Sequence, residues 1–408
     1  MAVKPNNFTW FVIGNGSWFT FFGMQMVLFA WLVAIELNEA PDRVGLAQAA
    51  LMLPVLLLSI LGGAIADKIG MRKVAALGHF IGVLPIIALS WITWTGNLRY
   101  EYLVIYALCM GVIQAFVSPS RDGMLALVAK GAIQRAVIIA TSIQFGVQIL
   151  GFSLAGSADL LGGGPVIAIQ ALVMLVGGLA FLKIELPMQK PVDDAAKESG
   201  WEMIVDGFRY VRSSRFLRPM IYINFAVGLN FMGVFMVGIP LLLRSQFEAT
   251  PVDLSIANII NMVGVLVMTM VLLKIGGIAR RGRAVLVALF LGAFIVAALG
   301  FEMPYWGVAL TIFAWGLGGG VAMTMTRSIA QEMAAPNYRA RVMALYATAF
   351  LGGAPIGSFI MGYLVKYFGA MDAMFVPAAG MIVMVVLIAW RTDLWQLSSD
   401  DIPTLDHR

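Results

Sequence analysis

The stretch "GGAIADKIGMRK", residues 62 to 73, gathers one acid and three bases among glycines, between two long apolar segments. Charge is scarce elsewhere, since 12% of the 408 residues are charged and 61% are hydrophobic. Soluble domains carry about 25% charged residues, so this chain could not present a water-compatible surface. A lipid bilayer is the expected solvent, and the stretch marks a break between two membrane spans.

Outward from this break, apolar segments recur with short polar interruptions along the whole chain. A transmembrane helix needs about 20 apolar residues, because lipid cannot satisfy backbone N–H and C=O groups. The sequence predicts twelve spans, near residues 10–35, 44–66, 74–94, 102–127, 136–158, 165–184, 219–243, 254–275, 284–301, 306–330, 342–365 and 371–390. The predicted fold class is an all-α membrane protein made of two pseudo-symmetric six-helix halves.

The predicted organisation divides the chain into four parts. Residues 1–184 form the first bundle, 185–218 a cytoplasmic linker, 219–390 the second bundle and 391–408 a short cytoplasmic tail. Within the linker, "SGWEMIVDGFRYVRSSRFLR", residues 199–218, has apolar residues at helical spacing with basic residues elsewhere on the wheel. It predicts an amphipathic helix at the membrane surface, and we favour a connecting role over a regulatory one.

The positions of the basic residues support this count of spans. The breaks assigned to the cytoplasm hold all but four of the 27 Lys and Arg residues; the exceptions are Arg43, Arg99, Arg244 and Lys366. Cytoplasmic loops retain basic residues, so both termini are expected in the cytoplasm, with the chain in a prokaryotic inner membrane. A missed or extra helix would scramble this asymmetry.

The two halves also carry an internal repeat. Arg121 and Arg327 are 206 positions apart, as are Arg135 and Arg341. The same offset relates Gly146 to Gly352, Gly151 to Gly357, Gly156 to Gly362 and Gly163 to Gly369. Many secondary transporters are built from such repeats, with the substrate site at the repeat interface. Transport is therefore favoured over a purely structural scaffold.

Several function classes are excluded by what the sequence lacks. The net charge of +5 comes without a basic block interleaved with aromatic residues, so nucleic acid is not an expected partner. One cysteine, Cys109, and two separated histidines, His79 and His407, provide neither a disulfide nor a metal site. There is no nucleotide-binding loop and no clustered catalytic set, so no cofactor, ATP-driven step or enzyme activity is expected.

The opening stretch resembles the signature loop of the major facilitator superfamily. Gly63, Asp67, Lys68 and Gly70 are in register with it, whereas Met71 replaces the usual base before Arg72 and Lys73. The second copy, "GGIARRGRA", residues 276–284, keeps a base and the last glycine but lacks the acid. The resemblance covers essentially the whole chain and implies the fold of that superfamily.

Within the superfamily the chain is similar to the branch of enterobactin exporters and macrolide or multidrug effluxers. The stretches that carry this likeness are "LAQAALMLPVLLLSILGGAIADK", "FVSPSRDGMLALV", "IVDGFRYVRSSRFLR" and "NYRARVMALYATAFLGGAPIG". The resemblance implies export of amphipathic small molecules driven by the proton gradient. The expected partners are therefore a small-molecule cargo, protons and the lipid bilayer; a monomeric chain is compatible with this.

The charged loop residues suggest a conformational latch. Asp67 could reach the amino end of the predicted span 342–365, where a helix dipole stabilises a carboxylate by about 0.3–1 kcal/mol. We expect this contact to bias a two-state equilibrium without locking it. Asp122 could pair with Arg72 or Lys68, and Arg121 could either pair within the membrane or snorkel to its surface. The predicted gating residues are Gly63, Asp67, Lys68, Gly70, Arg72, Arg121, Asp122, Arg327 and Arg341.

Polar and aromatic residues within the spans are the candidates for cargo contact. They are Phe19, Phe22, Gln25, Gln114, Gln144, Asn230, Asn258, Asn261 and Trp315. An amide between helices serves more often as interhelical hydrogen bonding than as a ligand contact. The set predicts a mostly apolar pocket, which suits a bulky, weakly polar cargo better than a sugar or a small anion. A small anion would require a buried base.

Proton coupling has little support in the residues themselves. No carboxylate lies in the middle of a predicted span, which leaves Glu36, His79 and Asp122 as candidate proton carriers. Antiport is thus implied by the resemblance. The alternatives are uptake or facilitated transport of a small metabolite and, from another class, a membrane sensor that transports nothing.

Overall fold

The computed structural model describes residues 7–129, 133–185, 200–275, 278, 280–335 and 338–397, and every regular element in them is helical. Within these described residues, twelve helices are long and apolar enough to cross a membrane, which confirms the predicted number of spans. They are Asn7–Glu36, Pro41–Ile69, Met71–Trp94, Tyr100–Leu125, Ile139–Leu161, Gly163–Leu182, Leu217–Phe247, Pro251–Ile275, Arg281–Ala298, Tyr305–Met333, Arg341–Phe368 and Asp372–Arg391.

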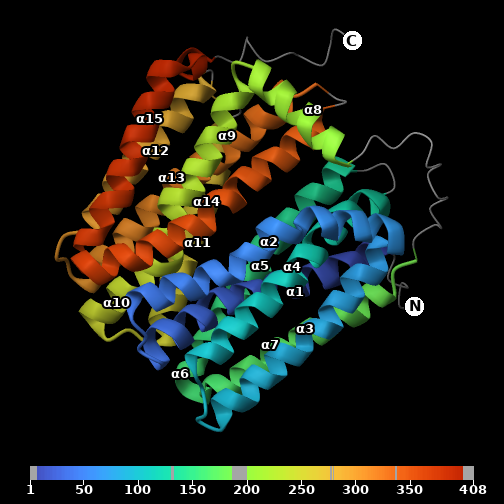
Figure 1. Cartoon of the computed structure of the whole chain (residues 1–408), viewed down its shortest axis with the longest axis vertical. Coiled ribbons are helices and arrows are strands. Elements are labelled where there is room, and N and C mark those ends of the chain that lie inside the picture. Colours follow the sequence, from blue (N-terminus) through green and yellow to red (C-terminus); the bar gives the residue numbers. More distant parts are fainter. Residues whose placement is uncertain are drawn as a thin grey trace. The chain divides into compact units, whose positions relative to one another are not determined.

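The chain forms two compact units, each with its own packing. Unit 1 comprises residues 1–189 and 240–259. Its helices are α1 (Asn7–Trp31), continued by the π-helix η1 (Leu32–Glu36), α2 (Pro41–Ile69), α3 (Met71–Trp94), α4 (Tyr100–Val128), α5 (Ile133–Gly156), α6 (Ala158–Leu161) and α7 (Gly163–Leu182). Helix α1 packs against α5 and α7, α2 packs against α4, and α3 packs against both α4 and α7 (Figure 1).

Unit 2 comprises residues 190–239 and 260–408. Its elements are α8 (Gly200–Ser213), α9 (Leu217–Ala226), the π-helices η3 (Val227–Met232) and η4 (Val234–Gly238), α12 (Arg281–Ala298), α13 (Tyr305–Met333), α14 (Arg339–Phe368), η5 (Asp372–Met374), α15 (Phe375–Arg391) and η6 (Asp393–Gln396). Helix α10 (Ile239–Phe247) lies almost wholly in unit 1, and α11 (Pro251–Ile275) is divided between the units. Helix α14 packs against α9, η3 and η4, and α12 packs against α13 and α15.

The helix predicted within the linker is present as α8. Gly207 and Val211 are buried, whereas Phe208, Arg209 and Arg212 are exposed. Val211 is on the buried side, whereas the apolar Phe208 is exposed together with the basic residues, so the two faces match the predicted amphipathic pattern only in part. The rest of the predicted linker, residues 186–199, and the tail residues 398–408 lie outside the described part of the chain.

The first and seventh spans are the most enclosed by protein. In each, 78% of the most apolar stretch is buried, against 17–50% in the other ten spans. These two spans also contain the π-helical segments η1, η3 and η4. Such segments are rare and occur frequently at functional sites. Since a carrier's path is lined by interior helices, these two spans are the first place to look for one.

The glycines of the internal repeat mark close helix crossings. A Cβ added at Gly151 of α5 would overlap the backbone carbonyl of Thr20 in α1. Its repeat mate Gly357, in α14, has the same relation to the carbonyl of Leu229 in η3. Small residues let two helix backbones approach closely where hydrophobic association is absent. The repeat therefore preserves one packing contact in each unit.

We expect Gly151→Ala to lower the melting temperature of the purified protein in detergent. The added methyl group meets a backbone atom that cannot move away cheaply, a kind of overpacking that costs about 1–3 kcal/mol. Gly146, one and a half turns earlier in α5, is the matched control, because an added Cβ there has nothing within 4 Å. Gly146→Ala should be neutral or stabilising. Equal melting temperatures for the two variants would contradict this packing.

Candidate functional site

The signature loop lies between α2 and α3. Gly70 has φ +107°, a conformation that favours glycine, and it makes the turn between α2 and α3. The close helix contact is at Gly62, where an added Cβ would overlap the carbonyl of Ala115 in α4. At Gly63 the nearest atom to an added Cβ is in Pro119, at 3.9 Å, so this position has room.

The charged residues near this loop pair differently from the prediction. Arg72 Nη1 donates to the backbone carbonyl of Ile184 at 2.8 Å, just beyond the end of α7. The last carbonyls of a helix have no partner within it, and the guanidinium supplies one. Asp122 lies 3.8 Å from Arg121 Nη2, with its side chain 78% exposed. The expected pairing of Asp122 with Arg72 or Lys68 is therefore replaced by one with its sequence neighbour.

The remaining predicted gating residues divide between the two units. In unit 1, Asp67 and Lys68 are exposed in the last turn of α2. In unit 2, Arg341 of α14 forms an ion pair with Asp206 of α8. Arg327, the repeat mate of Arg121, is exposed on α13. The structure thus gives Arg341 a carboxylate partner from the linker helix.

One side of α1 carries a row of polar and aromatic side chains that we call the α1 stripe. It consists of Asn15, Phe19, Phe22 and Met26, spaced at three and four residues so that they share one helix face. Asn15 is buried, and the other three are only partly buried. Gln148 of α5 donates to Met26 Sδ at 3.7 Å. This face of α1 is therefore turned toward α5 and, as the next contact shows, toward α4.

Arg121 of α4 is buried against the α1 stripe, with 3% of the residue exposed. Its Nη1 donates to Asn15 Oδ1 at 3.0 Å. Its guanidinium carbon lies 4.5 Å from the ring centroid of Phe19 and 5.4 Å from that of Trp18, both within cation–π range. Arg121 is thus enclosed by protein rather than extended to the surface, and its hydrogen-bond partner is a neutral amide.

His79 of α3 is enclosed beside this arginine, with none of its surface exposed. Its Nδ1 lies 2.7 Å from the Ala75 carbonyl, which can only accept, so Nδ1 carries the proton. The ring packs against Trp18 at 5.4 Å and Phe181 at 5.0 Å between centroids. A Cβ at Gly177 would come within 2.9 Å of Nε2. This tight aromatic enclosure favours a structural role for His79.

Gln25 joins three helices of unit 1. Its Oε1 accepts a hydrogen bond from the hydroxyl of Tyr106 in α4 and one from Gln170 Nε2 in α7, the latter at 3.1 Å. Gln170 Nε2 also lies 3.4 Å from the carbonyl of Phe21. All three side chains are buried. Gln25 therefore forms interhelical hydrogen bonds, the more common of the two roles expected for an amide between helices.

The other unit 1 candidates are more open. Gln114 of α4 and Gln144 of α5 are half-buried. Glu36, at the end of η1, is exposed. Among the described residues, no group of three His, Cys, Asp or Glu side chains could hold a metal ion. Gln114 and Gln144 remain candidates for cargo contact.

The candidate asparagines make local contacts. Asn230 and Asn258 each donate to the carbonyl four residues earlier in the same helix, at 3.0 and 2.8 Å. Asn261 Nδ2 lies 3.3 Å from the carbonyl of Ile312, which ties α11 to α13. Asn258 Oδ1 is buried and has no partner within the described residues. Asn258 is therefore the asparagine with an unused hydrogen-bonding atom.

Trp315 belongs to an aromatic cluster in unit 2. Its ring packs edge-to-face against Phe231 of η3 at 5.5 Å and Phe235 of η4 at 6.0 Å between centroids. Trp315 and Phe231 are 7% and 8% exposed. The cluster thus joins α13 to the π-helical part of the seventh span.

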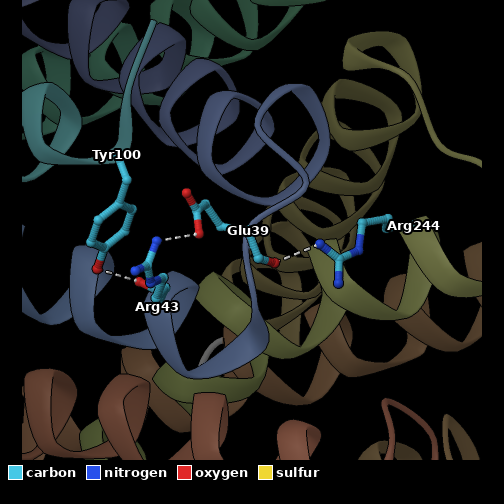
Figure 2. Close-up of polar contacts among 4 residues, drawn as sticks. All are labelled: Glu39, Arg43, Tyr100 and Arg244. Atoms are coloured by element: carbon cyan, nitrogen blue, oxygen red, sulfur yellow. Dashed lines mark hydrogen bonds and ion pairs between the residues drawn. The ribbon is translucent and has the colours of Figure 1, made fainter.

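A polar cluster in unit 1 that the sequence pattern does not predict involves Arg244 of α10 (Figure 2). Arg244 Nη1 donates to the carbonyls of Ala34 at 2.7 Å and Glu39 at 2.9 Å. The Glu39 carboxylate pairs with Arg43 at 3.1 Å, and the Tyr100 hydroxyl donates to the Arg43 carbonyl at 2.9 Å. Arg244, in α10 of the seventh span, therefore links this helix to the end of the first span and to the turn that follows it.

Comparison with known proteins agrees with this architecture. The sequence matches the transmembrane secretion effector family, MFS_3, over residues 7–407. It is 22% identical to a staphyloferrin A transporter of Staphylococcus aureus over 363 residues, which are 88% of each chain. It is also 22% identical to the multidrug efflux pump Tap of Mycobacterium tuberculosis over 382 residues, 90% of this chain and 89% of that one.

Solved structures of transporters share the fold. The nucleoside transporter NupG superposes with a TM-score of 0.71 at 16% identity, covering 95% of this chain and 99% of NupG. A bacterial homologue of the lysosomal transporter Spinster, in an inward-facing conformation, gives 0.72 at 11% identity over 99% and 100% of the two chains. With twelve candidate spans and a family match along nearly its whole length, the chain belongs to the transmembrane secretion effector family of major facilitator superfamily transporters.

Proposed function

We propose that this protein is a proton-coupled exporter of amphipathic small molecules that works by alternating access. It lies in a prokaryotic inner membrane with both termini in the cytoplasm, the orientation that places nearly all its basic residues inside. The observation that carries the proposal is the α1 stripe, where partly buried aromatic side chains and an amide lie on a span whose most apolar stretch is 78% buried. Apolar walls with few polar groups suit a bulky, weakly polar molecule.

The relatives support the direction and the class of cargo. One is a transporter of staphyloferrin A and another is a multidrug efflux pump, while the family is described as a secretion effector. A nucleoside needs many hydrogen-bonding groups along its path, and the α1 stripe offers one amide among three apolar side chains. Export of a drug-like or siderophore-like molecule is therefore preferred to uptake of a polar metabolite.

Among the proposed proton carriers, Asp122 is the best placed. Its carboxylate is largely hydrated and lies beside the Arg121 guanidinium, so a proton arriving from water would change the charge next to the α1 stripe. Glu36 is also hydrated, but it lies beyond the end of α1. His79 is sealed among aromatic rings. A proton-carrying role is thus proposed first for Asp122.

Reconstituted vesicles provide the test. With an acidic lumen, we expect proteoliposomes to accumulate amphipathic dyes such as ethidium and dansylglycine above protein-free liposomes, and an uncoupler should abolish the accumulation. Accumulation that is insensitive to both the pH gradient and the uncoupler would contradict proton coupling. No transport of any amphipathic dye or siderophore in either direction would contradict the proposed function as a whole.

A further inference from the structure

The preference for basic residues in cytoplasmic loops does not explain why the Arg121 side chain is buried. Its repeat mate Arg327, at nearly the same distance from the end of α13, is exposed, whereas Arg121 is 3% exposed. Asn15 lies eight residues into α1, and Arg121 lies seven residues before the end of α4. At 1.5 Å per residue, both lie about 10–12 Å inside the helix ends. A charged side chain that is removed from water is costly to keep and usually has a functional role.

The hydrogen-bonding groups of this guanidinium are only partly used. Arginine has five N–H donors. Nη1 donates to a neutral amide oxygen, and Nε is buried without a partner among the described residues. The one nearby carboxylate, Asp122, is 3.8 Å away and largely in water. A buried charge normally has a close counter-ion with good geometry, and the residues around Arg121 do not provide one.

The side chains around Arg121 indicate what kind of ligand could bind its free N–H donors. The faces of Phe19 and Trp18 lie against the guanidinium, and Phe19 and Phe22 continue along the partly buried α1 stripe. A planar acid group would meet the free donors of the arginine, while an attached apolar or aromatic body would lie along the phenylalanines. A small anion was not expected as cargo because the sequence showed no buried base. Arg121 is a buried base.

We infer that Arg121, with Asn15, Phe19 and Trp18, forms a subsite for the anionic group of the cargo. The cargo is then an amphipathic acid, one that joins a carboxylate or similar planar anion to an apolar body. Asp122 competes with the bound anion for the same guanidinium. This inference rests on the proposed export function and narrows its cargo class.

A matched pair of probes tests the subsite. Dansylglycine and dansylglycinamide differ only in a carboxylate against a neutral amide, and their binding can be measured by equilibrium dialysis against protein in phosphatidylcholine nanodiscs, with empty nanodiscs as background. We expect the wild-type protein to bind the acid at least tenfold more tightly than the amide. Arg121→Gln should bring this ratio close to one, and Arg121→Lys should give an intermediate ratio because lysine lacks the planar fork.

Two further variants keep the test decisive. Asp122→Asn should tighten binding of the acid several-fold and leave the amide unchanged, since it removes a competing carboxylate and retains Arg121. Arg99→Gln, the control at an exposed base, should leave the acid-to-amide ratio as in the wild type. If Arg121→Gln does not fold, the Asp122→Asn result decides: no gain for the acid overturns the inference.

Three other outcomes distinguish a cargo anion from a lipid phosphate, and the anion subsite from the proposed export function. Equal weakening of both probes by Arg121→Gln would mean a structural arginine and overturn the subsite. Loss of dansylglycine binding when phosphatidylglycerol replaces phosphatidylcholine would assign Arg121 to a lipid phosphate and overturn it too. If the wild type moves ethidium under a pH gradient but does not prefer the acid probe, the subsite fails and the export function stands.

Discussion

Replacing Arg244 with alanine should lower the transport rate at least tenfold and also lower the melting temperature. The guanidinium donates to two backbone carbonyls, that of Ala34 within η1 and that of Glu39 in the turn before α2; Figure 2 shows the contact with Glu39. Hydrogen bonds to a charged group contribute about 1.5–3 kcal/mol each, and their loss leaves the Ala34 carbonyl near a helix end without this partner. Dye accumulation in proteoliposomes and thermal unfolding in detergent measure the two effects.

The effect on transport follows from where this contact lies. Arg244 joins part of the seventh span to the end of the first span, the two spans that are most enclosed by protein. A carrier must both make and break the contacts that close one end of its path, and a change of about 1.4 kcal/mol alters the balance of two states tenfold. The loss of Arg244 therefore favours one state at the expense of turnover.

Two variants control for this interpretation of Arg244. Arg244→Lys keeps the charge on a single ammonium that cannot hold both carbonyls in the same geometry, so an intermediate rate is expected. Arg99→Ala removes an exposed base among the four that lie outside the basic breaks, and transport should stay within twofold of the wild type. If Arg99→Ala and Arg244→Ala behave alike, loss of surface charge rather than a specific contact explains the result.

Asp67→Asn should also lower transport at least tenfold, while making the protein slightly more stable. Asp67 is an exposed acid in the last turn of α2, where the helix dipole disfavours negative charge by about 0.3–1 kcal/mol. Removal of the charge therefore removes this unfavourable interaction and stabilises α2. The latch hypothesis explains why the acid is present, since it would stabilise one of the two alternating states.

The opposite signs of the two effects make this prediction specific. Expression and melting temperature should be unchanged or raised in Asp67→Asn, so that a slower rate cannot be ascribed to misfolding. Asp67→Glu should restore much of the rate, and Asp159→Asn, which removes an exposed acid in the first turn of α6, should leave it unchanged. Normal transport by well-expressed Asp67→Asn would refute the latch.

The features of the fold that depend on lipid and on backbone geometry could be predicted from the sequence. The twelve spans follow because every apolar stretch must be long enough to cross the bilayer. The break at residues 62–73 follows from its charge, and glycine suits the turn at Gly70. The repeat aligns Gly151 with Gly357, but their place at helix crossings comes from the structure.

The site was less predictable because it depends on partners from distant parts of the chain. Arg121 and Arg327 occupy equivalent positions in the repeat, yet only Arg121 meets Asn15 and two aromatic faces of α1. Arg244 bonds to backbone carbonyls, which no residue type marks in a sequence. The π-helical segments have no recognisable sequence signal either.

The most direct test of alternating access is the accessibility of one position on the α1 stripe from both sides of the membrane. Cys109, the single cysteine, is exposed and is first replaced by serine. Phe22→Cys in that background, once shown to transport, is then treated with a membrane-impermeant maleimide in right-side-out and in inside-out vesicles. The account predicts labelling from both sides, slowed in each case by dansylglycine. Labelling from one side only, whatever the pH gradient or cargo, would contradict it.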